Sequence, residues 1–556
     1  MPTLRLNRKE FENLVGKRLS EEKLKDRISM LGTDLEEVND KEIIVEVFPD
    51  RPDMLSEQGF ARAFSAFIDV KPGLRKYKVK NSGEKIIIKD SVKEIRPYTV
   101  CAIIKNLKFN DEKIKEIIQI QEKLHVTFGR KRKKLAIGIY PCEKIKFPVT
   151  YFAENPEKVK FRPLEYKNEL NGLQILKLHP VGKEYAHLLE GCKQFPFFKD
   201  ANNNILSMPP IINSYDTGRI TEETKEIFIE CSGFEWHNLN FCLNIIVTAL
   251  ADMGGEIYSL ELDYKNKKEI TPDLNPKEWN LNIGNVNRLL GLDLKKNKIK
   301  ELLEFMGYDY KNNKVLVPAY RSDVIHEVDI IEDIAIAYGF ENFKEEIPKV
   351  ATIAEENPLQ ILKRKISDIL IGHKLIETNS YNLADKEDMI TRMNNKISCI
   401  ELTNPVNQDY NVMRPWVLPS LIKILSENKH NEYPQNLFEM GDIFKKTENG
   451  TQIKEAIRLA IVLCHEKTNF TEIKQILDSL MNALDLSYTI EETKHNSFIE
   501  GRVGRISVKK KEIAYIGEIH PQVLVNFGLN YPVAALELNL TDLLNFCLES
   551  EPKPLK

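Results

Sequence analysis

Four carboxylates close to residue 330 have the spacing of an oxygen-ligand site. They lie in the segment VPAYRSDVIHEVDIIEDIAIAYGF (317–340), and the candidate ligands are Asp323, Asp329, Glu332 and Asp333. If residues 326–338 form a helix, the last three occupy neighbouring positions on one face. Carboxylates without histidine or cysteine favour a hard cation such as Mg²⁺, which keeps several waters beside one or two carboxylates. The alternative is a solvated acidic face on an amphipathic helix.

A run of adjacent cations directly precedes the apolar segment LAIGIY. The run is GRKRKK (129–134), and it predicts a local RNA-binding patch at Arg130, Lys131, Arg132 and Lys133. Clustered cations attract phosphates, and such binding weakens steeply with salt. The alternative is a solvated turn before a strand.

A third group combines an extended segment with polar side chains. Pro209-Pro210, in LSMPPIINS (206–214), excludes helix, and Asn213 and Ser214 follow it. In IFIECSGF (227–234), Glu230 and Ser232 share one face of an expected strand. Together they could hold an amino acid with a polar ring substituent, although such groups also serve as ordinary loop hydrogen bonds. The candidate pocket residues are Leu206, Pro209, Asn213, Ser214, Glu230 and Ser232.

Composition and missing motifs exclude several other classes of protein. There is no phosphate loop of the GxxxxGK[ST] type, no GxSxG elbow and no HExxH zinc helix. The eight cysteines are scattered without a CxxC pair, which argues against a structural zinc site. The net charge of -3 shows no overall basicity. Because the first residues, MPTLRLNRKEFENLVG, carry charges and no apolar leader, we expect a cytoplasmic protein with reduced thiols.

The 556-residue chain requires several domains to position these groups. Apolar spacing predicts a helix over 7–31, a strand over 42–50, a Lys-rich linker around 74–86 and a hinge around 345–358. The expected domains are an N-terminal α/β domain (1–80), a mixed α/β domain (88–270), a small helix-rich acidic domain (271–347) and a second large domain (359–556).

The motifs resemble, in chain order, the beta subunit of phenylalanyl-tRNA synthetase of the archaeal and eukaryotic cytosolic type. DRPDMLS (50–56) is similar to an early signature of that family. LSMPPIIN and FIECSG are similar to its editing domain, and GRKRKKLAIGI is similar to a segment just upstream of that domain. RSDVIHEVDIIEDIAIAYG resembles its small acidic domain. Its catalytic-like domain is similar to ELTNPVNQDYNVMRPWVLPSLI, LFEMGDIF, GRVGRI and GEIHPQVLVNFGL.

The resemblance implies a multidomain α/β and α+β fold and a subunit of an aminoacyl-tRNA ligase. With an alpha subunit, in an α2β2 heterotetramer, the chain would support ATP-dependent attachment of phenylalanine to tRNA-Phe. ATP and phenylalanine would bind on the alpha subunit, and the four carboxylates would share Mg²⁺ with it. The editing domain (88–270) would hydrolyse mischarged tyrosyl-tRNA-Phe, although the chain departs from the family's motif at Phe234 and Glu235.

The last domain (359–556) is expected to be a class II synthetase-like antiparallel sheet that lacks catalytic ligands. A class II site needs arginines that bind the ATP α- and γ-phosphates. Here Asn436-Leu437-Phe438-Glu439 has no arginine two residues before Glu439, and GRVGR (501–505) leads into a charged hairpin. We therefore expect no aminoacylation residues on this chain.

Two competing functions remain open at this point. One is a structural scaffold that holds the alpha subunit and tRNA and carries an inert editing domain. The other, more remote, is a free-standing RNA-binding protein.

Overall fold

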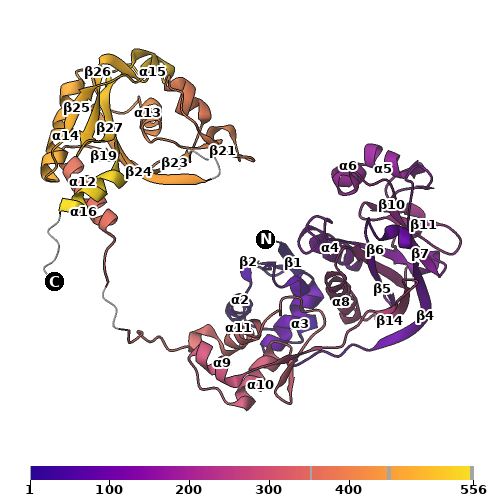
Figure 1. The fold of residues 1–556 in the computed structure, drawn as a ribbon. Coiled ribbons are helices and arrows are strands. Elements are labelled where there is room, and N and C mark those ends of the chain that lie inside the picture. Colours follow the sequence, from indigo (N-terminus) through magenta and orange to yellow (C-terminus); the bar gives the residue numbers. More distant parts are fainter. Residues whose placement is uncertain (1, 351–353, 448–451, 551–556) are drawn as a thin grey trace. The chain divides into compact units, whose positions relative to one another are not determined.

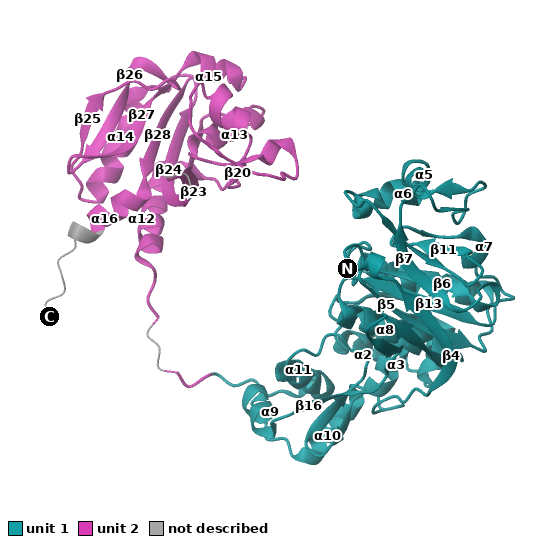
Figure 2. Cartoon of the chain, turned by 45° about the vertical axis from the view of Figure 1, so that its right-hand side comes forward, with its two compact units in different colours: residues 1–347 teal, residues 348–556 magenta. Residues whose placement is uncertain are grey.

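The computed structural model describes residues 2–350, 354–447 and 452–550. The chain folds as two compact units, residues 1–347 and 348–556 (Figure 2). Within the described ranges, no helix combines the length and the apolar character needed to span a bilayer.

The first unit begins with a small antiparallel sheet in the order β1-β3-β2. Two helices, rather than the single predicted one, occupy residues 7–31, because Gly16 adopts a left-handed conformation (φ 83°) and ends the first of them. Strand β3 lies in the first part of the strand predicted over 42–50. The elements are β1 (Thr3–Asn7), α1 (Arg8–Val15), α2 (Glu21–Met30), β2 (Asp34–Val38), β3 (Glu42–Glu46) and α3 (Glu57–Phe67).

A ten-stranded mixed sheet follows, in the order β12-β11-β10-β7-β4-β14-β5-β13-β6, with β15 paired to β14 (Figure 1). The linker expected around 74–86 is wrong in its second half, which belongs to strand β4. The strands are β4 (Val79–Ile88), β5 (Tyr98–Lys105), β6 (Leu135–Pro141), β7 (Val149–Glu154), β10 (Phe195–Lys199), β11 (Ile205–Met208), β12 (Ile212–Asn213), β13 (Ile227–Gly233), β14 (Glu256–Asp263) and β15 (Lys268–Thr271). The helices of this region include α4 (Asp111–Val126), α5 (Gly172–Leu178), α6 (Pro180–Tyr185), α7 (Tyr215–Gly218) and α8 (Trp236–Asp252).

The last part of the first unit is a three-stranded sheet with three helices. The helix predicted over 326–338 is present as α11, and its start is fixed by a capping box between His326 and Asp329. The elements are β16 (Lys277–Asn280), α9 (Ile283–Leu290), α10 (Lys296–Phe305), β17 (Asp309–Lys311), β18 (Lys314–Val317) and α11 (Glu327–Tyr338). Residues 343–350 and 354–357 form no helix or strand.

The second unit contains a seven-stranded sheet in the order β19-β23-β24-β28-β27-β26-β25, antiparallel except for β19 beside β23. Its strands are β19 (Ile376–Glu377), β23 (Gln435–Lys446), β24 (Ile453–Cys464), β25 (Thr489–Glu492), β26 (Phe498–Val508), β27 (Lys511–Ile519) and β28 (Val533–Asn539). The helices that pack on it include α12 (Pro358–Gly372), α13 (Leu418–Glu427), α14 (Phe470–Ala483), α15 (Pro521–Asn526) and α16 (Leu540–Ser550).

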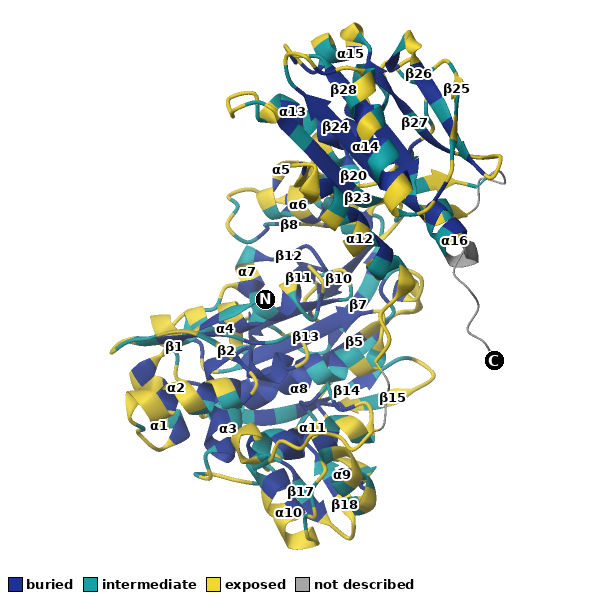
Figure 3. Ribbon diagram, turned by 90° about the vertical axis from the view of Figure 1, so that its left-hand side faces the viewer, coloured by how far each residue is buried: buried dark blue, intermediate teal, exposed yellow. Residues whose placement is uncertain are grey.

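Both faces of the seven-stranded sheet are buried. Along β24, Leu459 and Ile461 join the core under α12 and α14, whereas Ala460 and Val462 join the core under α13, as the two-residue period of a strand requires. Figure 3 shows the central strands of both large sheets as buried. The predicted multidomain, mixed α/β architecture is confirmed.

Candidate functional site

The ten-stranded sheet contains a buried carboxyl group, that of Glu230. Strand β13 is buried along its whole length between β5 and β6 and places Glu230 opposite Gly138 of β6. The phenol oxygen of Tyr140 lies 3.2 Å from Oε1 of Glu230 and 2.8 Å from Oγ of Ser207. Glu230 is 2% exposed, and its Oε2 has no hydrogen-bond partner among the described residues.

Burial raises the pKa of Glu230 to about 8, although the hydrogen bond from Tyr140 and the charge of Arg96 oppose the shift. At neutral pH this carboxyl group is therefore largely protonated. A neutral carboxyl group can both donate and accept a hydrogen bond. Glu230 can therefore bind an uncharged hydroxyl group without a counter-ion.

Glu230 forms part of the wall of a cavity of about 590 Å³. The cavity lies between helix α4, strand β6 and the segment 207–220. Among the predicted pocket residues, Pro209, Asn213 and Glu230 line it. The structure thus brings an amide and a buried carboxyl group together in one apolar cavity, which is the usual composition of a small-ligand site.

The other three predicted pocket residues lie outside this cavity wall. Leu206 is completely buried in the core beside Phe228. Ser214 is buried, and its backbone N–H donates to the carbonyl of Leu206. Ser232 is also buried and accepts a hydrogen bond from Nε of Arg96 through its hydroxyl group (3.3 Å). These residues therefore do not line the cavity. The side chain of Ser232 on strand β13 points toward Arg96, and the side chain of Leu206 on strand β11 packs in the core.

The two positions at which the chain departs from the family's editing motif also lie outside the cavity wall. Phe234 is half exposed beneath the guanidinium group of Arg96, whose carbon is 5.3 Å from the ring centre. Glu235 precedes helix α8 and binds the amide of Asn238. Neither departure therefore places a side chain in the cavity wall.

Three residues of the predicted basic patch are exposed to solvent, and the fourth lines the cavity. Arg130, Lys131 and Lys133 are exposed, as expected. Arg132 instead turns inward: it donates to the carbonyl of Ile211 (2.9 Å) and to Glu122 (3.0 Å) and lines the cavity. Arg132 therefore differs from the other three residues of the predicted patch, because its charge is paired with Glu122.

An unusual backbone conformation causes this division. Arg130, Lys131 and Arg132 all have positive φ values (49°, 52° and 63°), which cost roughly 1–2 kcal/mol per residue for side chains other than glycine. The turn reverses the chain directly before β6. The hydrogen bonds of Arg132 and the stacking of its guanidinium group 4.4 Å from the ring centre of Tyr185 hold the turn in place.

Sequence reasoning missed Tyr140, Ser207 and His125 as members of this site. His125 donates from Nδ1 to Glu122 (3.1 Å) and accepts the N–H of Ile137 at Nε2 (2.8 Å). Burial lowers its pKa, so the ring is neutral. Gly138 is also required: a Cβ there would stand 2.1 Å from the phenol oxygen of Tyr140 and 2.6 Å from Oε1 of Glu230. The alternation of LAIGIY does place Gly138 and Tyr140 on one face, which was the available signal.

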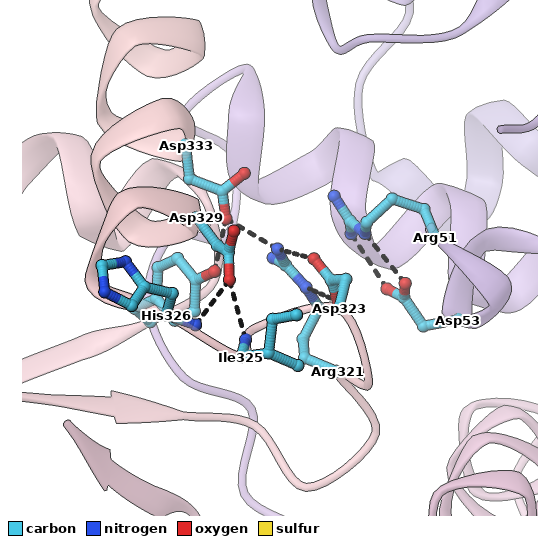
Figure 4. A network of polar contacts seen from close by, with 9 residues as sticks. Arg51, Asp53, Arg321, Asp323, Ile325, His326, Asp329 and Asp333 are labelled. Carbon is cyan, nitrogen blue, oxygen red and sulfur yellow. Dashed lines mark hydrogen bonds and ion pairs between the residues drawn. The ribbon is translucent and has the colours of Figure 1, made fainter. Parts of the chain in front are cut away.

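The acidic segment around α11 is a network of carboxylates and arginines (Figure 4). Asp323 accepts Nε (2.8 Å) and Nη2 (2.5 Å) of Arg321. Asp333 accepts Nη2 of the same arginine (2.7 Å) and the hydroxyl group of Tyr308. Although burial favours the protonated form, Arg321 and Arg51 hold the pKa of Asp323 below its usual value. Two of the four predicted magnesium ligands are thus already neutralised by arginine.

The other two predicted ligands keep free oxygens. Asp329 caps α11 with Oδ2, which accepts the N–H groups of Ile325 and His326. No donor among the described residues reaches its Oδ1 or either oxygen of the exposed Glu332. Partial burial and the neighbouring carboxylates raise the pKa of Glu332. A cation would relieve that repulsion.

The donor set fits magnesium only in part. Within the described ranges, no three His, Cys, Asp or Glu side chains converge well enough to hold a metal ion. Mg²⁺ usually binds one or two carboxylates and several waters, and Asp329 and Glu332 can supply those two. Asp323 and Asp333 are engaged by Arg321 in this structure, so a magnesium site that uses all four carboxylates stays a prediction.

The second unit has its own buried ion pair. Arg414 and Glu439 are each about 1% exposed, with Nη1 2.7 Å from Oε1, and Ser380 donates to the other oxygen of Glu439. Arg502 binds Glu518 and Arg505 binds Glu512. These arginines therefore have carboxylate partners within the unit.

Comparison with known proteins decides the family. A model of the phenylalanyl-tRNA synthetase beta chain CLM domain matches residues 344–540, and one of the tRNA synthetase B5 domain matches residues 279–340. The phenylalanine–tRNA ligase beta subunit of Pyrococcus abyssi is 40% identical over 98% of this chain and 100% of its own length. The chain belongs to the phenylalanine–tRNA ligase beta subunit family.

Other members of this family of beta subunits agree. The Methanococcus aeolicus beta subunit is 38% identical over 97% of this chain and all of its own length. The crystal structure of an N-terminal fragment of the phenylalanyl-tRNA synthetase beta subunit from Pyrococcus horikoshii matches with a TM-score of 0.58 and 39% identity. It covers 61% of this chain and 99% of the fragment. The family resemblance predicted from the motifs is confirmed.

Proposed function

We propose that this beta subunit supports, with an alpha subunit, the ATP-dependent attachment of phenylalanine to tRNA-Phe and that its own cavity hydrolyses tyrosyl-tRNA-Phe. The editing role rests on one observation: a buried carboxyl group, Glu230, with an unpaired oxygen in the wall of a cavity of about 590 Å³. Family membership supports the synthetic role.

The unpaired oxygen of Glu230 suits a tyrosine side chain. Tyrosine differs from phenylalanine by one hydroxyl group, and an apolar synthetic site rejects such an added hydroxyl only weakly. A phenol group would complete the hydrogen bonding of Glu230, whereas the ring of phenylalanine would leave it unpaired. An unsatisfied buried polar group costs about 1–3 kcal/mol, which corresponds to roughly 5- to 150-fold discrimination in favour of tyrosine.

Hydrolysis at this site does not require a protein nucleophile. A water molecule can attack the ester if it is held close to the carbonyl carbon and if backbone N–H groups stabilise the oxyanion. Asn213 is the candidate group for holding the amino acid or the ester. The exposed Arg130, Lys131 and Lys133 lie on the turn that Arg132 fixes to the cavity wall, where they would attract the phosphates of the tRNA.

Each region then has a proposed role. Residues 88–270 form the editing domain, and residues 271–347 form a small acidic domain that would meet the alpha subunit and share Mg²⁺ with it through Asp329 and Glu332. Residues 359–556 form a catalytic-like domain without nucleotide ligands, in which Arg414, Arg502 and Arg505 are held by carboxylates. This domain would supply most of the interface in an α2β2 assembly.

Deacylation by the assembled complex tests the editing role. Glu230→Ala should lower hydrolysis of tyrosyl-tRNA-Phe at least about tenfold and leave phenylalanine charging unchanged. Glu256→Gln is a matched control, because it removes a carboxylate of the same sheet that pairs with Lys80 at the surface. Parental deacylation by the Glu230→Ala complex would place the editing site elsewhere.

A further inference from the structure

A second cavity, of about 20 Å³, lies inside the first unit between helix α3 and the segment that leads to α11. Among the described residues, its wall contains four arginines and one carboxylate: Arg51, Arg62, Arg75, Arg321 and Asp53. A cavity needs about 10–15 Å³ to hold one water molecule. This cavity therefore has room for one water or one monatomic ion and is too small for phosphate or sulfate.

Arg321 presents one unpaired nitrogen to this cavity. Its Nε and Nη2 atoms bind Asp323 and Asp333, neither of which lines the cavity. Its Nη1 atom is buried and has no partner among the described residues. Arg321 lines the cavity, and Nη1 is its nitrogen that remains available to a ligand there.

Arg62 is arranged in the same way from helix α3. Its Nη1 atom donates to Tyr77 and to Asp252 (2.8 Å each), and neither residue lines the cavity. Its Nη2 atom is buried without a partner in the described part of the chain. The guanidinium carbon stands 4.0 Å from the ring centre of Tyr320, which fixes the plane of the group. The side chains of Arg62 and Arg321 are 6% and 2% exposed, so bulk water does not satisfy these nitrogens.

The single carboxylate of the wall is already engaged. Both oxygens of Asp53 accept hydrogen bonds from Arg51, at 2.9 Å each, in the same two-bond fork that Arg321 makes with Asp323 (Figure 4). Two arginines with unpaired N–H groups thus line a small cavity in which the carboxylate of Asp53 already accepts a hydrogen bond at each oxygen. A water molecule could accept both hydrogen bonds but would then need acceptors for its own protons. A monatomic anion accepts both and needs none.

We propose that this cavity binds a single chloride ion between Nη2 of Arg62 and Nη1 of Arg321. The ion joins helix α3 of the N-terminal part to the segment before α11 through the unpaired N–H groups of Arg62 and Arg321. It is a structural ion of this chain and is independent of the editing cavity.

Bromide provides a direct probe of the parental chain. Crystals of the full chain grown in sodium bromide should show one anomalous peak in the cavity, within hydrogen-bonding distance of both nitrogens. In crystals of the Arg62→Lys variant, which keeps a cation beside Asp252 but lacks Nη2, the peak should be lost. Ordinary water density without an anomalous signal in the parent, or an unchanged peak in the variant, would overturn the proposal.

Solution stability supplies an independent test. At matched ionic strength, the first unit should unfold on the order of 2–4 °C higher in sodium chloride than in sodium gluconate, and the effect should saturate with chloride concentration. Arg62→Lys should abolish this difference. Arg364→Gln, which removes an exposed arginine paired with Glu356 in the second unit, should preserve it. Equal unfolding temperatures of the parent in the two salts would contradict a bound anion.

Discussion

The phenol oxygen of Tyr140 lies 3.2 Å from Oε1 of Glu230, between two neighbouring strands and out of contact with bulk water. Tyr140 thereby forms a hydrogen bond with one oxygen of the carboxyl group, and the other oxygen remains available to a ligand. It also fixes the orientation of Glu230 before any substrate arrives, and such preorganisation is what a specificity site needs.

Stability should depend on pH through Glu230. The unfolded chain releases this proton near pH 4.5, whereas the folded chain keeps it until about pH 8, so the parent loses stability as pH rises through this window. The unfolding free energy of Glu230→Gln relative to the parent should therefore grow by about 1.4 kcal/mol per pH unit between these values and level off above them. Thermal unfolding measured from pH 4.5 to 9 checks this. A flat difference across the window would show that Glu230 ionises in the folded state at its ordinary pKa.

Gly138→Ala should displace the side chains of Tyr140 and Glu230. The added Cβ would stand 2.1 Å from the phenol oxygen of Tyr140, so the phenol must move and release Glu230. We expect a loss of about 1–3 kcal/mol in stability and a large loss of tyrosyl-tRNA-Phe hydrolysis. Combining it with Tyr140→Phe, which removes the clashing oxygen, should restore part of the stability, as a double-mutant cycle would show. If the two losses simply add, the clash is not the cause.

The carboxylates of α11 should control assembly with the alpha subunit at low magnesium. In a complex carrying Asp329→Asn and Glu332→Gln, the magnesium concentration needed for half-maximal assembly should rise at least about tenfold. The fold of the beta chain should be unaffected, because asparagine can still cap the helix. Glu327→Gln is the control, since Glu327 binds Asn282 and Asn285 instead. Analytical ultracentrifugation across a magnesium titration measures the effect, and an unchanged midpoint would leave these carboxylates as a solvated face.

The beta chain alone should not activate phenylalanine. Arg414, Arg502 and Arg505 of its second unit are paired with carboxylates, which leaves them less available to phosphates. Phenylalanine-dependent ATP–pyrophosphate exchange should therefore be at background for the isolated chain and appear once the alpha subunit is added. Robust exchange by the chain alone would contradict the proposed division of labour.

Local patterns predicted much of this structure. Residue spacing placed a helix over 326–338, which is present as α11, and strand alternation placed Glu230 and Ser232 on β13. The register between strands was not accessible, because Tyr140 meets Glu230 across 90 residues of chain. Nor did the sequence show that Arg321 would neutralise Asp323 and Asp333, since spacing reports which side chains share a face but not which partners they choose.

The left-handed turn at Arg130–Arg132 also makes the site accessible to a protease. Trypsin cleaves after lysine and arginine, and the turn exposes Arg130 and Lys131, which have positive φ values, and Lys133 beside them. The hydrogen bond from Arg132 to Ile211 holds the turn against the cavity wall. A ligand that restricts the motion of Arg132 would protect the turn from cleavage, and loss of the hydrogen bonds of Arg132 would make the turn easier to cleave. The rate of tryptic cleavage at this turn should therefore fall when a ligand fills the cavity, and it can be measured without labelling the substrate.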